Sequence, residues 1–423
     1  MGGYTAEAET GFNHRTAMEE AARCLLCEDA PCSMGCPAGT NPGDFIRSIR
    51  FRNTKGAAEI IRENNVLGGS CARVCPYDKL CEEACSRCGI DRPIEIGKLQ
   101  RYAIEQEKIF GMKTLKKPRS RKKGRVACVG AGPASLACAA ELAKAGYEAT
   151  IFEREAKAGG VLSYGITPAR LPQKVVDWDI ATVKGIGVKF EFGKEIGKKI
   201  TAKDLLEKQG FDAVFVGAGL WKSGSASVPG EDLKNILSAV GFLKKARAEG
   251  GFKDMKGKKV VVIGGGDVAM DCATTAKLLG ASDVHIWYRR TIEEAPANID
   301  EIRYALSLGI TITTNFAPKS FGGKTKVEFA EFQGRDGKSE AKVCCDYAVL
   351  AIGQQAEDIT GVADAALSGK GCIAARGGGK TTVPGVFAAG DIVNGGKTVV
   401  EAVAAGKEAA ETIIAYLDKK GVK

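Results

Sequence analysis

Two glycine-rich turns constrain the fold of this 423-residue chain more than any other feature. They are Gly130-Ala-Gly132-Pro-Ala-Ser135 and Gly264-Gly-Gly266-Asp-Val-Ala269, and each stands between an apolar, strand-like run and a helical pattern. The first glycine of such a unit makes the turn, the second lets backbone approach a pyrophosphate, and the helix N-terminus offers free N–H groups to the anion. The sequence therefore predicts α/β structure with two dinucleotide-binding domains. A tight strand-to-helix turn without a ligand is the alternative.

The two units differ at the end of their second strands. In the first unit Thr150-Ile-Phe-Glu153 ends on a carboxylate, where an acid accepts hydrogen bonds from an adenosine ribose. In the second unit the strand runs into Arg289-Arg290, and guanidinium groups pair with a 2′-phosphate that a carboxylate would repel. The second unit therefore favours NADPH over NADH. A solvated arginine pair at a strand end is the alternative.

Composition separates three zones along the chain. At about 150 residues per domain the length suggests roughly three domains, and 44% apolar residues exclude a disordered or fibrous chain. Residues 1–112 predict a helical domain, with helical segments at 43–64 and 96–110, and residues 113–124 predict a basic linker. The α/β part begins at Arg125.

Nine of the 15 cysteines fall in the helical zone. No apolar run approaches the roughly 20 residues that span a bilayer, so we expect a cytoplasmic protein without a membrane partner, in which reduced thiols ligate metal. The cysteines form the runs Cys24-x2-Cys27-x4-Cys32-x3-Cys36-Pro37 and Cys71-x3-Cys75-Pro76-x4-Cys81-x3-Cys85, with Cys88 beyond. Such runs are typical of [4Fe–4S] proteins, and eight or nine thiols suffice for two clusters. Structural zinc and a purely structural role are the alternatives.

This cofactor set predicts an electron path. Two nucleotide domains beside two clusters imply hydride transfer from NAD(P)H to a flavin, followed by single-electron transfer. The chain has only two histidines, and no acid–base constellation for protonating an organic substrate emerges. We therefore assign no catalytic residue and expect the final reduction to occur on another polypeptide.

The formal net charge of +10 raises nucleic acid as a partner. Eight of the thirteen residues in Lys113–Arg125 are basic, but no aromatic residue is interleaved with them for base stacking. We expect a solvated linker and no nucleic-acid partner.

In combination the motifs resemble the glutamate synthase small-subunit family of FAD- and iron–sulfur-containing NAD(P)H oxidoreductases, over about residues 15–418. The residues that carry the resemblance are the cysteine runs, Val129–Ser135, Gly159-Gly160, Arg170-Leu-Pro172, Gly264–Asp271 and Ala389-Gly-Asp391. Within that family, Lys55–Asn65, Cys71–Pro76 and Pro93–Gln100 look most like the electron-input subunits of bacterial dihydropyrimidine dehydrogenases.

The resemblance implies a glutathione-reductase-like arrangement of two Rossmann-like domains. FAD would bind residues 125–223 and 351–423, interrupted by an NAD(P)H domain at 224–350. Ser135, in place of the usual third glycine, is expected to loosen helix–strand packing. NADPH is the expected nicotinamide, with NADH as the alternative. The implied cofactor-binding residues are Gly130, Gly132, Pro133, Ala134, Glu153, Gly160, Val161, Arg170, Gly264, Gly265, Gly266, Asp267, Val268, Arg289, Arg290, Gly353, Gly390, Asp391 and Thr398.

The resemblance also implies the cluster ligands. A glutamine at the place of Gln100 is an unusual ligand in the dihydropyrimidine dehydrogenases, whereas glutamate synthase relatives tend to have glutamate. Cys71 is a substitute candidate, and a helix-surface amide is the alternative reading of Gln100. One implied ligand set is Cys24, Cys27, Cys32 and Cys85, and the other is Cys36, Cys75, Cys81 and Gln100.

The implied activity is that of an electron-input subunit. NAD(P)H would reduce FAD, and electrons would pass through two [4Fe–4S] clusters to a PreA-like, FMN- and iron–sulfur-containing partner that reduces uracil or thymine to the 5,6-dihydro form. The chain is too short to include the FMN domain, so a heteromer is expected. The alternative keeps the same internal path but delivers electrons to glutamate synthase or a ferredoxin.

Overall fold

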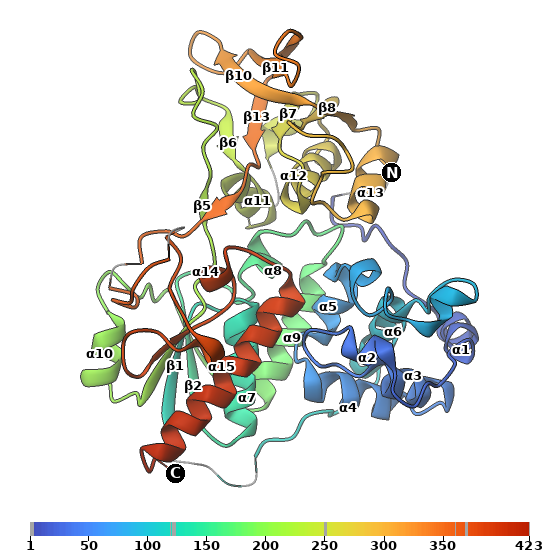
Figure 1. Ribbon diagram of the computed structural model, residues 1–423, viewed down its shortest axis with the longest axis vertical. Coiled ribbons are helices and arrows are strands. Elements are labelled where there is room, and N and C mark those ends of the chain that lie inside the picture. The colour runs from blue at the N-terminus through green and yellow to red at the C-terminus, as the bar shows by residue number, and fades with distance from the viewer. Residues whose placement is uncertain are drawn as a thin grey trace. The chain divides into compact units, whose positions relative to one another are not determined.

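The computed structural model describes residues 4–118, 120, 124–248, 252–359, 361–368 and 371–422 (Figure 1). The chain divides into two compact units. One comprises residues 1–8, 164–172 and 221–355, and we call it the nicotinamide unit; the other comprises 9–163, 173–220 and 356–423, and we call it the flavin–cysteine unit. Four residues of the expected linker, 119 and 121–123, lie outside the described residues.

The cysteine-rich part of the flavin–cysteine unit is helical, as predicted. Its core includes Phe45, Ile61 and Leu99, all fully buried. The expected helix at 43–64 forms two helices, because Arg52 takes a φ of +60° and the Asn53 side chain caps the second helix through the Gly56 N–H. The helices are α1 (His14–Ala22), α2 (Pro31–Met34), α3 (Pro42–Arg50), α4 (Thr54–Asn64), α5 (Gly68–Val74) and α6 (Ile96–Ile109), with 3₁₀ helices Tyr77–Lys79 and Ser86–Gly89.

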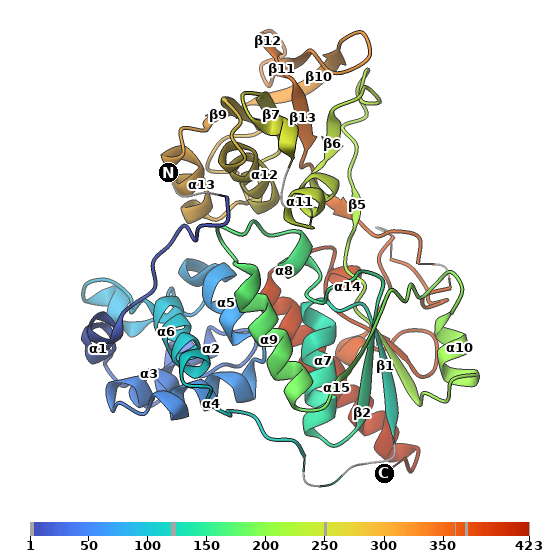
Figure 2. The same cartoon turned by 180° about the vertical axis from the view of Figure 1, so that it is seen from behind.

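A five-stranded parallel sheet forms the rest of this unit, in the order β15-β4-β1-β2-β3. Helices α7 and α15 pack against each other beside it (Figures 1 and 2). Because β15 comes from the C-terminal segment, the sheet joins two parts of the chain that the nicotinamide unit separates. The elements are β1 (Arg125–Val129), α7 (Pro133–Lys144), β2 (Glu148–Glu153), α8 (Val161–Tyr164), α9 (Gln173–Gly185), β3 (Lys189–Phe192), α10 (Ala202–Glu207), β4 (Ala213–Val216), β15 (Val386–Ala388), α14 (Asp391–Asn394) and α15 (Val399–Lys419), with a 3₁₀ helix at Gly377–Gly379.

A buried ionic network ties the helical part to the sheet part. Arg62 of α4 pairs with Glu107 of α6 at 2.7 Å and with Asp179 of α9 at 2.6 Å, and all three side chains are at most 1% exposed. Asp179 also accepts hydrogen bonds from the Ser70 N–H and hydroxyl at the start of α5. Trp178 of α9 donates to Glu107 at 2.9 Å. The network therefore fixes α4, α5 and α6 to α9, which belongs to the sheet part of the same unit.

The nicotinamide unit contains a second parallel sheet, ordered β6-β13-β7-β8-β9. An antiparallel sheet, β10-β11-β12, covers one face, where Trp287 stacks on Phe332 with ring centres 4.0 Å apart. No described helix in the chain is long and apolar enough to cross a membrane. The elements are β5 (Lys222–Ser223), β6 (Ile236–Ser238), α11 (Ala239–Ala248), β7 (Lys259–Ile263), α12 (Asp267–Leu278), β8 (Asp283–Trp287), α13 (Ile299–Ser307), β9 (Thr311–Thr313), β10 (Phe316–Gly322), β11 (Phe329–Gly334), β12 (Glu340–Cys344), β13 (Tyr347–Leu350) and β14 (Gln354–Gln355), with a 3₁₀ helix at Lys253–Met255.

Candidate cofactor sites

The first glycine turn joins β1 to α7 and leaves a helix N-terminus free. Gly130 has a φ of +86°, and a Cβ there would lie 2.8 Å from the Gly217 carbonyl oxygen, so only glycine fits without strain. Gly132 is the N-cap of α7, has no side-chain cap, and is followed by Pro133 at N1. A Cβ on Gly132 would meet only one atom within 4 Å, at 3.9 Å. The turn therefore presents uncapped backbone N–H groups beside open space, as a pyrophosphate requires.

Glycines from three distant segments converge on this turn. A Cβ on Gly160 would lie 2.8 Å from the Gly132 Cα, and one on Gly390 would lie 2.9 Å from the Ala134 Cβ. Gly406 of α15 lies so close to the Ala134 carbonyl oxygen that a Cβ would sit 2.2 Å from it. The structure thus brings together the predicted residues of both flavin segments around the start of α7.

Three further predicted residues lie at the starts of helices. Val161 begins α8 directly after Gly160, and Asp391 begins α14 directly after Gly390. Burial raises the pKa of the Asp391 carboxyl, although the Lys397 N–H donates to it. Thr398 is the N-cap of α15 and forms a reciprocal capping pair with Glu401. The Thr398 hydroxyl is therefore already engaged within its own helix.

Glu153 closes the flavin turn from the end of β2. Its Oε2 accepts a hydrogen bond from the Ala131 N–H at 2.7 Å, and its Oε1 accepts one from the Glu155 N–H at 2.9 Å. Burial raises the pKa of this carboxyl, and the two N–H donors oppose that shift. Each carboxylate oxygen still has a lone pair for a hydroxyl donor, so the group fits the ribose role that the sequence predicts.

Ser135 does not loosen the packing of α7 on β1, contrary to the expectation from its sequence. The side chain is fully buried, and its hydroxyl donates to the Val129 carbonyl oxygen at 3.3 Å. Gly217 makes the room, because a Cβ there would lie 2.3 Å from the Ser135 Oγ. Sequence reasoning missed Gly217, although the phrase Val216-Gly-Ala-Gly219 after an apolar run was an available signal.

The second glycine turn joins β7 to α12 and repeats this geometry. Gly264 has a φ of +146°, and a Cβ there would lie 2.2 Å from the Ala351 carbonyl oxygen. Gly265 lies against the Tyr288 ring, and a Cβ on Gly265 would lie 2.4 Å from a carbon of that ring. Gly266 is the N-cap of α12 without a side-chain cap. Asp267 and Val268 follow in the first turn, where Asp267 accepts a hydrogen bond from the Asn298 N–H at 2.7 Å.

The predicted arginines lie exposed after β8. Arg289 and Arg290 follow Tyr288, whose hydroxyl donates to the Glu294 carbonyl oxygen at 2.9 Å. The Glu294 carboxylate pairs with Arg335 at 3.0 Å. The Thr291 N–H, then Arg335 and Arg290, lower the pKa of Glu294. Arg290 and Arg335 therefore flank one carboxylate, and a positive surface lies at the strand end where a 2′-phosphate would bind.

Two further predicted cofactor residues belong to the nicotinamide unit. Arg170 pairs with Asp271 at 2.9 Å and with Glu301 at 2.5 Å, and its side chain is 12% exposed. Its two carboxylate partners belong to α12 and α13. Gly353, with a φ of +111°, accepts a hydrogen bond from the Gly224 N–H beside the β5–β14 pair. The structure thus gives Arg170 a role in holding residues 164–172 within the nicotinamide unit.

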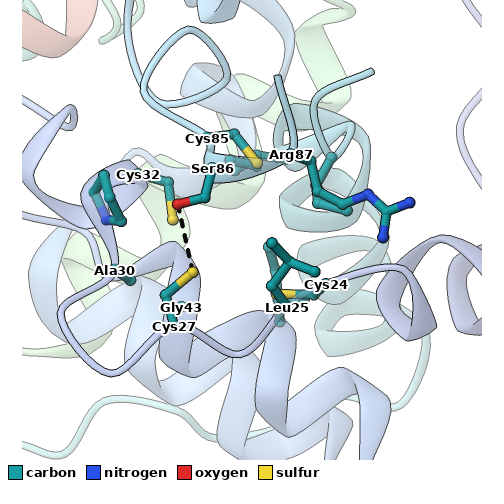
Figure 3. A pocket seen from close by; sticks show the side chains of 13 residues that line it. Cys24, Leu25, Cys27, Ala30, Cys32, Gly43, Cys85, Ser86 and Arg87 are labelled. Atoms are coloured by element: carbon teal, nitrogen blue, oxygen red, sulfur yellow. Dashed lines mark hydrogen bonds between the residues drawn. The ribbon is translucent and has the colours of Figure 1, made fainter. Parts of the chain in front are cut away.

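Four predicted cysteine ligands surround one hollow in the helical part (Figure 3). Cys24, Cys27, Cys32 and Cys85 line a cavity of about 370 Å³, open mouth included, and Ile46, Ile94 and Ile96 form its apolar wall. Cys27 lies 3.5 Å from the Ser86 hydroxyl. Burial raises the pKa of Cys24, and it raises the pKa of Cys32 to about 11. Four soft ligands around an apolar hollow suit an iron–sulfur cluster, whose binding would displace these protons.

The other predicted ligands gather at α5 and the loop after it. Cys75 follows α5, and a hydrogen bond with Cys71, burial, and the charges of Cys81 and Cys36 raise the pKa of its thiol. Burial, followed by Glu82 and Cys36, raises the pKa of Cys81. The structure thus places Cys36, Cys75 and Cys81 within one electrostatic group, with Cys71 beside Cys75.

Gln100 lies on α6 and contacts the start of α5. Its Nε2 donates to the Gly68 carbonyl oxygen at 2.8 Å, so its Oε1 remains an acceptor without a partner in the described hydrogen bonds. That hydrogen bond fixes which end of the amide is free to bind a metal. Gln100 therefore contacts the start of α5 and Cys71 lies within α5, and the choice between them as fourth ligand stays a prediction.

Comparisons with known proteins match nearly the whole chain. Residues 3–111 match a family described as dihydropyrimidine dehydrogenase domain II, 4Fe-4S cluster, which favours iron–sulfur over zinc for the cysteine runs. Residues 124–406 match the pyridine nucleotide-disulphide oxidoreductases. The NAD-dependent dihydropyrimidine dehydrogenase subunit PreT of Escherichia coli K12 is 44% identical, with 98% of each chain covered. The small chain of NADPH glutamate synthase from the same strain is 32% identical over 96% of this chain and 93% of its own.

Solved structures share the α/β fold. FprA of Mycobacterium tuberculosis, solved in complex with NADPH, has a TM-score of 0.62 at 20% identity, covering 71% of this chain and 86% of its own. Thioredoxin reductase of T. acidophilum has a TM-score of 0.55 at 21% identity, covering 70% of this chain and 98% of its own. The predicted fold class, a helical iron–sulfur domain followed by α/β nucleotide-binding domains, is confirmed. The chain belongs to the oxidoreductase family that includes the PreT subunits of dihydropyrimidine dehydrogenase and the small chains of glutamate synthase.

Proposed function

We propose that the chain is the electron-input subunit of an NAD(P)H-dependent dihydropyrimidine dehydrogenase. The observation that carries this proposal is the full-length similarity to PreT, at 44% identity over 98% of both chains. When bound, FAD accepts a hydride from NAD(P)H, and two [4Fe–4S] clusters carry single electrons onward. The final reduction, of uracil or thymine to the 5,6-dihydro form, takes place on an FMN- and iron–sulfur-containing partner subunit in the cytoplasm.

The described residues fit the flavin role. The uncapped N-terminus of α7 would receive the pyrophosphate of FAD, and Gly132 leaves room for its approach. Glu153 would accept a ribose hydroxyl with a carboxylate that burial has already removed from water. Gly160 and Gly390 close on α7 without side chains, so the backbone itself lines the site.

The described residues also fit two clusters. Cys24, Cys27, Cys32 and Cys85 would hold the first, and Leu25 and Arg87 line the same hollow (Figure 3). Leu25 is 47% exposed despite its place beside Cys24, which leaves an apolar rim for a partner. The second cluster would bind to Cys36, Cys75, Cys81 and Gln100, with Cys71 as the alternative to Gln100. We infer that the first cluster is the exit to the partner.

NADPH is the nicotinamide that the positive surface after β8 favours. Arg289 and Arg290 are exposed, and Arg335 lies on the same carboxylate as Arg290. Guanidinium groups bind a phosphate through charge-assisted hydrogen bonds. We therefore propose NADPH for this chain, whereas its PreT relatives are named as NAD-dependent.

Co-expression tests the proposed function. The chain is produced with an FMN- and iron–sulfur-containing dihydropyrimidine dehydrogenase subunit, and uracil-dependent NADPH oxidation is measured. We expect a stable complex that forms dihydrouracil. Turnover of glutamine plus 2-oxoglutarate with a glutamate synthase large subunit, without uracil reduction by the first pair, would replace the pyrimidine assignment with that of the 32% identical relatives.

A matched cysteine pair separates the internal path from the final reaction. Cys85→Ser removes a predicted ligand of the first cluster, so we expect loss of uracil reduction while NADPH still reduces FAD. Cys88→Ser is the control, because Cys88 is exposed and its thiol donates only to the carbonyl oxygens of Glu82 and Glu83 in the described hydrogen bonds. Equal losses of uracil reduction in Cys85→Ser and Cys88→Ser would contradict the proposal that electrons leave through the first cluster.

A further inference from the structure

Lys407 of α15 contacts the cysteine-rich helical part of the flavin–cysteine unit. Its Nζ donates to the Ala38 carbonyl oxygen at 2.5 Å and to the Asn64 carbonyl oxygen at 2.8 Å. Asn64 is the last residue of α4, where free carbonyl groups favour a cation. One ammonium group therefore joins three elements of the flavin–cysteine unit.

The Ala38 carbonyl belongs to a turn that begins at a predicted cluster ligand. The Gly39 N–H donates to the Cys36 carbonyl oxygen at 3.0 Å, and Gly39 takes a φ of +70°. A Cβ on Gly39 would lie 3.9 Å from the Lys407 Nζ. Lys407 therefore holds the turn that carries Cys36.

The preceding residue of α15 contacts the flavin turn. Gly406 packs on the Ala134 carbonyl oxygen, so Gly406 and Lys407 contact the predicted flavin site and the Cys36 turn from adjacent positions. This region of α15 therefore contacts both predicted cofactor sites. Lys407 is consequently placed to influence electron transfer between them.

Charged side chains of both signs surround the ammonium group of Lys407. Glu141 and Lys144 face it from α7, but they pair with each other at 2.6 Å. Glu411, on the next turn of α15, is exposed. Burial lowers the pKa of Lys407 and Lys144 adds to that shift, while Glu141 and Cys36 oppose it. A negatively charged cluster at Cys36 would further favour the ammonium form.

We propose that Lys407 is a positioning residue that fixes the Cys36 turn to the flavin domain and raises the reduction potential of the second cluster. The inference rests on the proposed function, because it needs a cluster at Cys36. Reduction adds one negative charge to a cluster, and a nearby fixed cation stabilises the reduced state. Removing the cation therefore makes the cluster harder to reduce.

An anaerobic redox titration of the isolated chain, followed by electron paramagnetic resonance, tests the inference. The variants are Lys407→Met, Lys407→Gln, which keeps an amide donor without the charge, and Lys407→Arg, which keeps the charge. Lys144→Met is the matched control, because Lys144 donates to the Glu63 carbonyl oxygen at 2.8 Å and so bridges α7 to the end of α4 without touching the Cys36 turn. The signal that survives in Cys85→Ser identifies the second cluster.

We expect the potential of the second cluster to fall in Lys407→Met and Lys407→Gln and to be restored in Lys407→Arg. A tenfold change in the equilibrium between flavin and cluster corresponds to about 59 mV for one electron. The shift should exceed that of Lys144→Met, and the first cluster should change less. Unchanged potentials in both neutral variants, with both clusters present, overturn the inference. If the Lys407→Met variant does not retain the second cluster, the potential measured in Lys407→Gln is the test. A wild-type chain with fewer than two clusters overturns the proposed function itself.

Discussion

The two nucleotide turns have nearly the same backbone in different surroundings. Gly130 and Gly264 both take a positive φ, and each lies against a carbonyl oxygen of a neighbouring strand end. In the flavin–cysteine unit, however, the Glu153 side chain at the strand end is buried, and glycines of distant segments close on the turn. In the nicotinamide unit the corresponding strand end carries the exposed Arg289 and Arg290. We therefore propose that the first turn retains FAD and that the second turn exchanges NADPH.

Each unit also contains an arginine that pairs with two carboxylates. Arg62 is fully buried, and its partners Glu107 and Asp179 are at most 1% exposed. Arg170 is 12% exposed, and its partner Glu301 is 14% exposed. Solvent screens the second arginine more, so we expect the flavin–cysteine unit to depend more strongly on its arginine.

Replacing the two arginines should have the largest effect on stability. Arg62→Met leaves two buried carboxylates without their cation, and we expect a loss of about 3–5 kcal/mol from the free energy of unfolding. Arg170→Met should cost less. Urea unfolding measures the free energy of unfolding of both variants. Flavin absorbance follows the flavin–cysteine unit, and tryptophan fluorescence follows the whole chain. A larger loss in Arg170→Met would reverse the comparison.

Alanine substitutions at Gly130 and Gly264 should affect the binding of FAD and of NADPH independently. Gly130→Ala should weaken FAD retention, and Gly264→Ala should raise the KM for NADPH while FAD is retained. The positive φ alone costs about 1–3 kcal/mol, and the carbonyl contacts add to it. Gly309→Ala is the control, because Gly309 has a φ of +74° with no atom within 4 Å of a Cβ. Loss of FAD in Gly264→Ala would contradict the separation. FAD content and steady-state kinetics measure the outcome.

Charge reversal at the exposed strand end should change nicotinamide choice. We expect Arg290→Asp to lower kcat/KM for NADPH by about 10- to 100-fold, because a charged hydrogen bond contributes about 1.5–3 kcal/mol, and to leave NADH nearly unaffected. Arg303→Asp is the control, since Arg303 is exposed on α13 and pairs with Asp300. Equal losses with NADPH and NADH would contradict a 2′-phosphate role.

The smallest effect should be a pH dependence of the nicotinamide unit. Burial lowers the pKa of His285, whose Nε2 lies 2.7 Å from the Thr313 hydroxyl. The folded chain therefore binds this proton less tightly than the unfolded chain, and stability falls as pH drops below about 6.5. His285→Gln should reduce the dependence of the free energy of unfolding on pH between pH 7.5 and 5.5, as measured by urea unfolding.

The sequence predicted what short segments determine. Both turns, the strand that ends on Glu153 and the helix at 96–110 depend on neighbours within a few positions. Asn53 was a readable signal as well, because an asparagine before a helical run is a common N-cap, and it explains why residues 43–64 form two helices.

Contacts between distant segments could not be predicted in this way. Lys407 and Ala38 are 369 positions apart, and no local pattern links them. Arg62 occupies a polar position of an amphipathic helix, where a solvated side chain is the usual outcome, yet tertiary contacts bury it. Arg170 matched a cofactor motif, but its ion pairs with Asp271 and Glu301 depend on α12 and α13.

The central claim is an internal path from NADPH through one FAD to two four-iron clusters. Anaerobic titration of the purified chain with NADPH, combined with iron, sulfide and flavin analysis, tests it most directly. We expect about eight irons per flavin, flavin bleaching on the first addition, and two reduced-cluster signals that appear only when FAD is bound. One cluster or none, or clusters that stay oxidised while the flavin is fully reduced, would contradict the account.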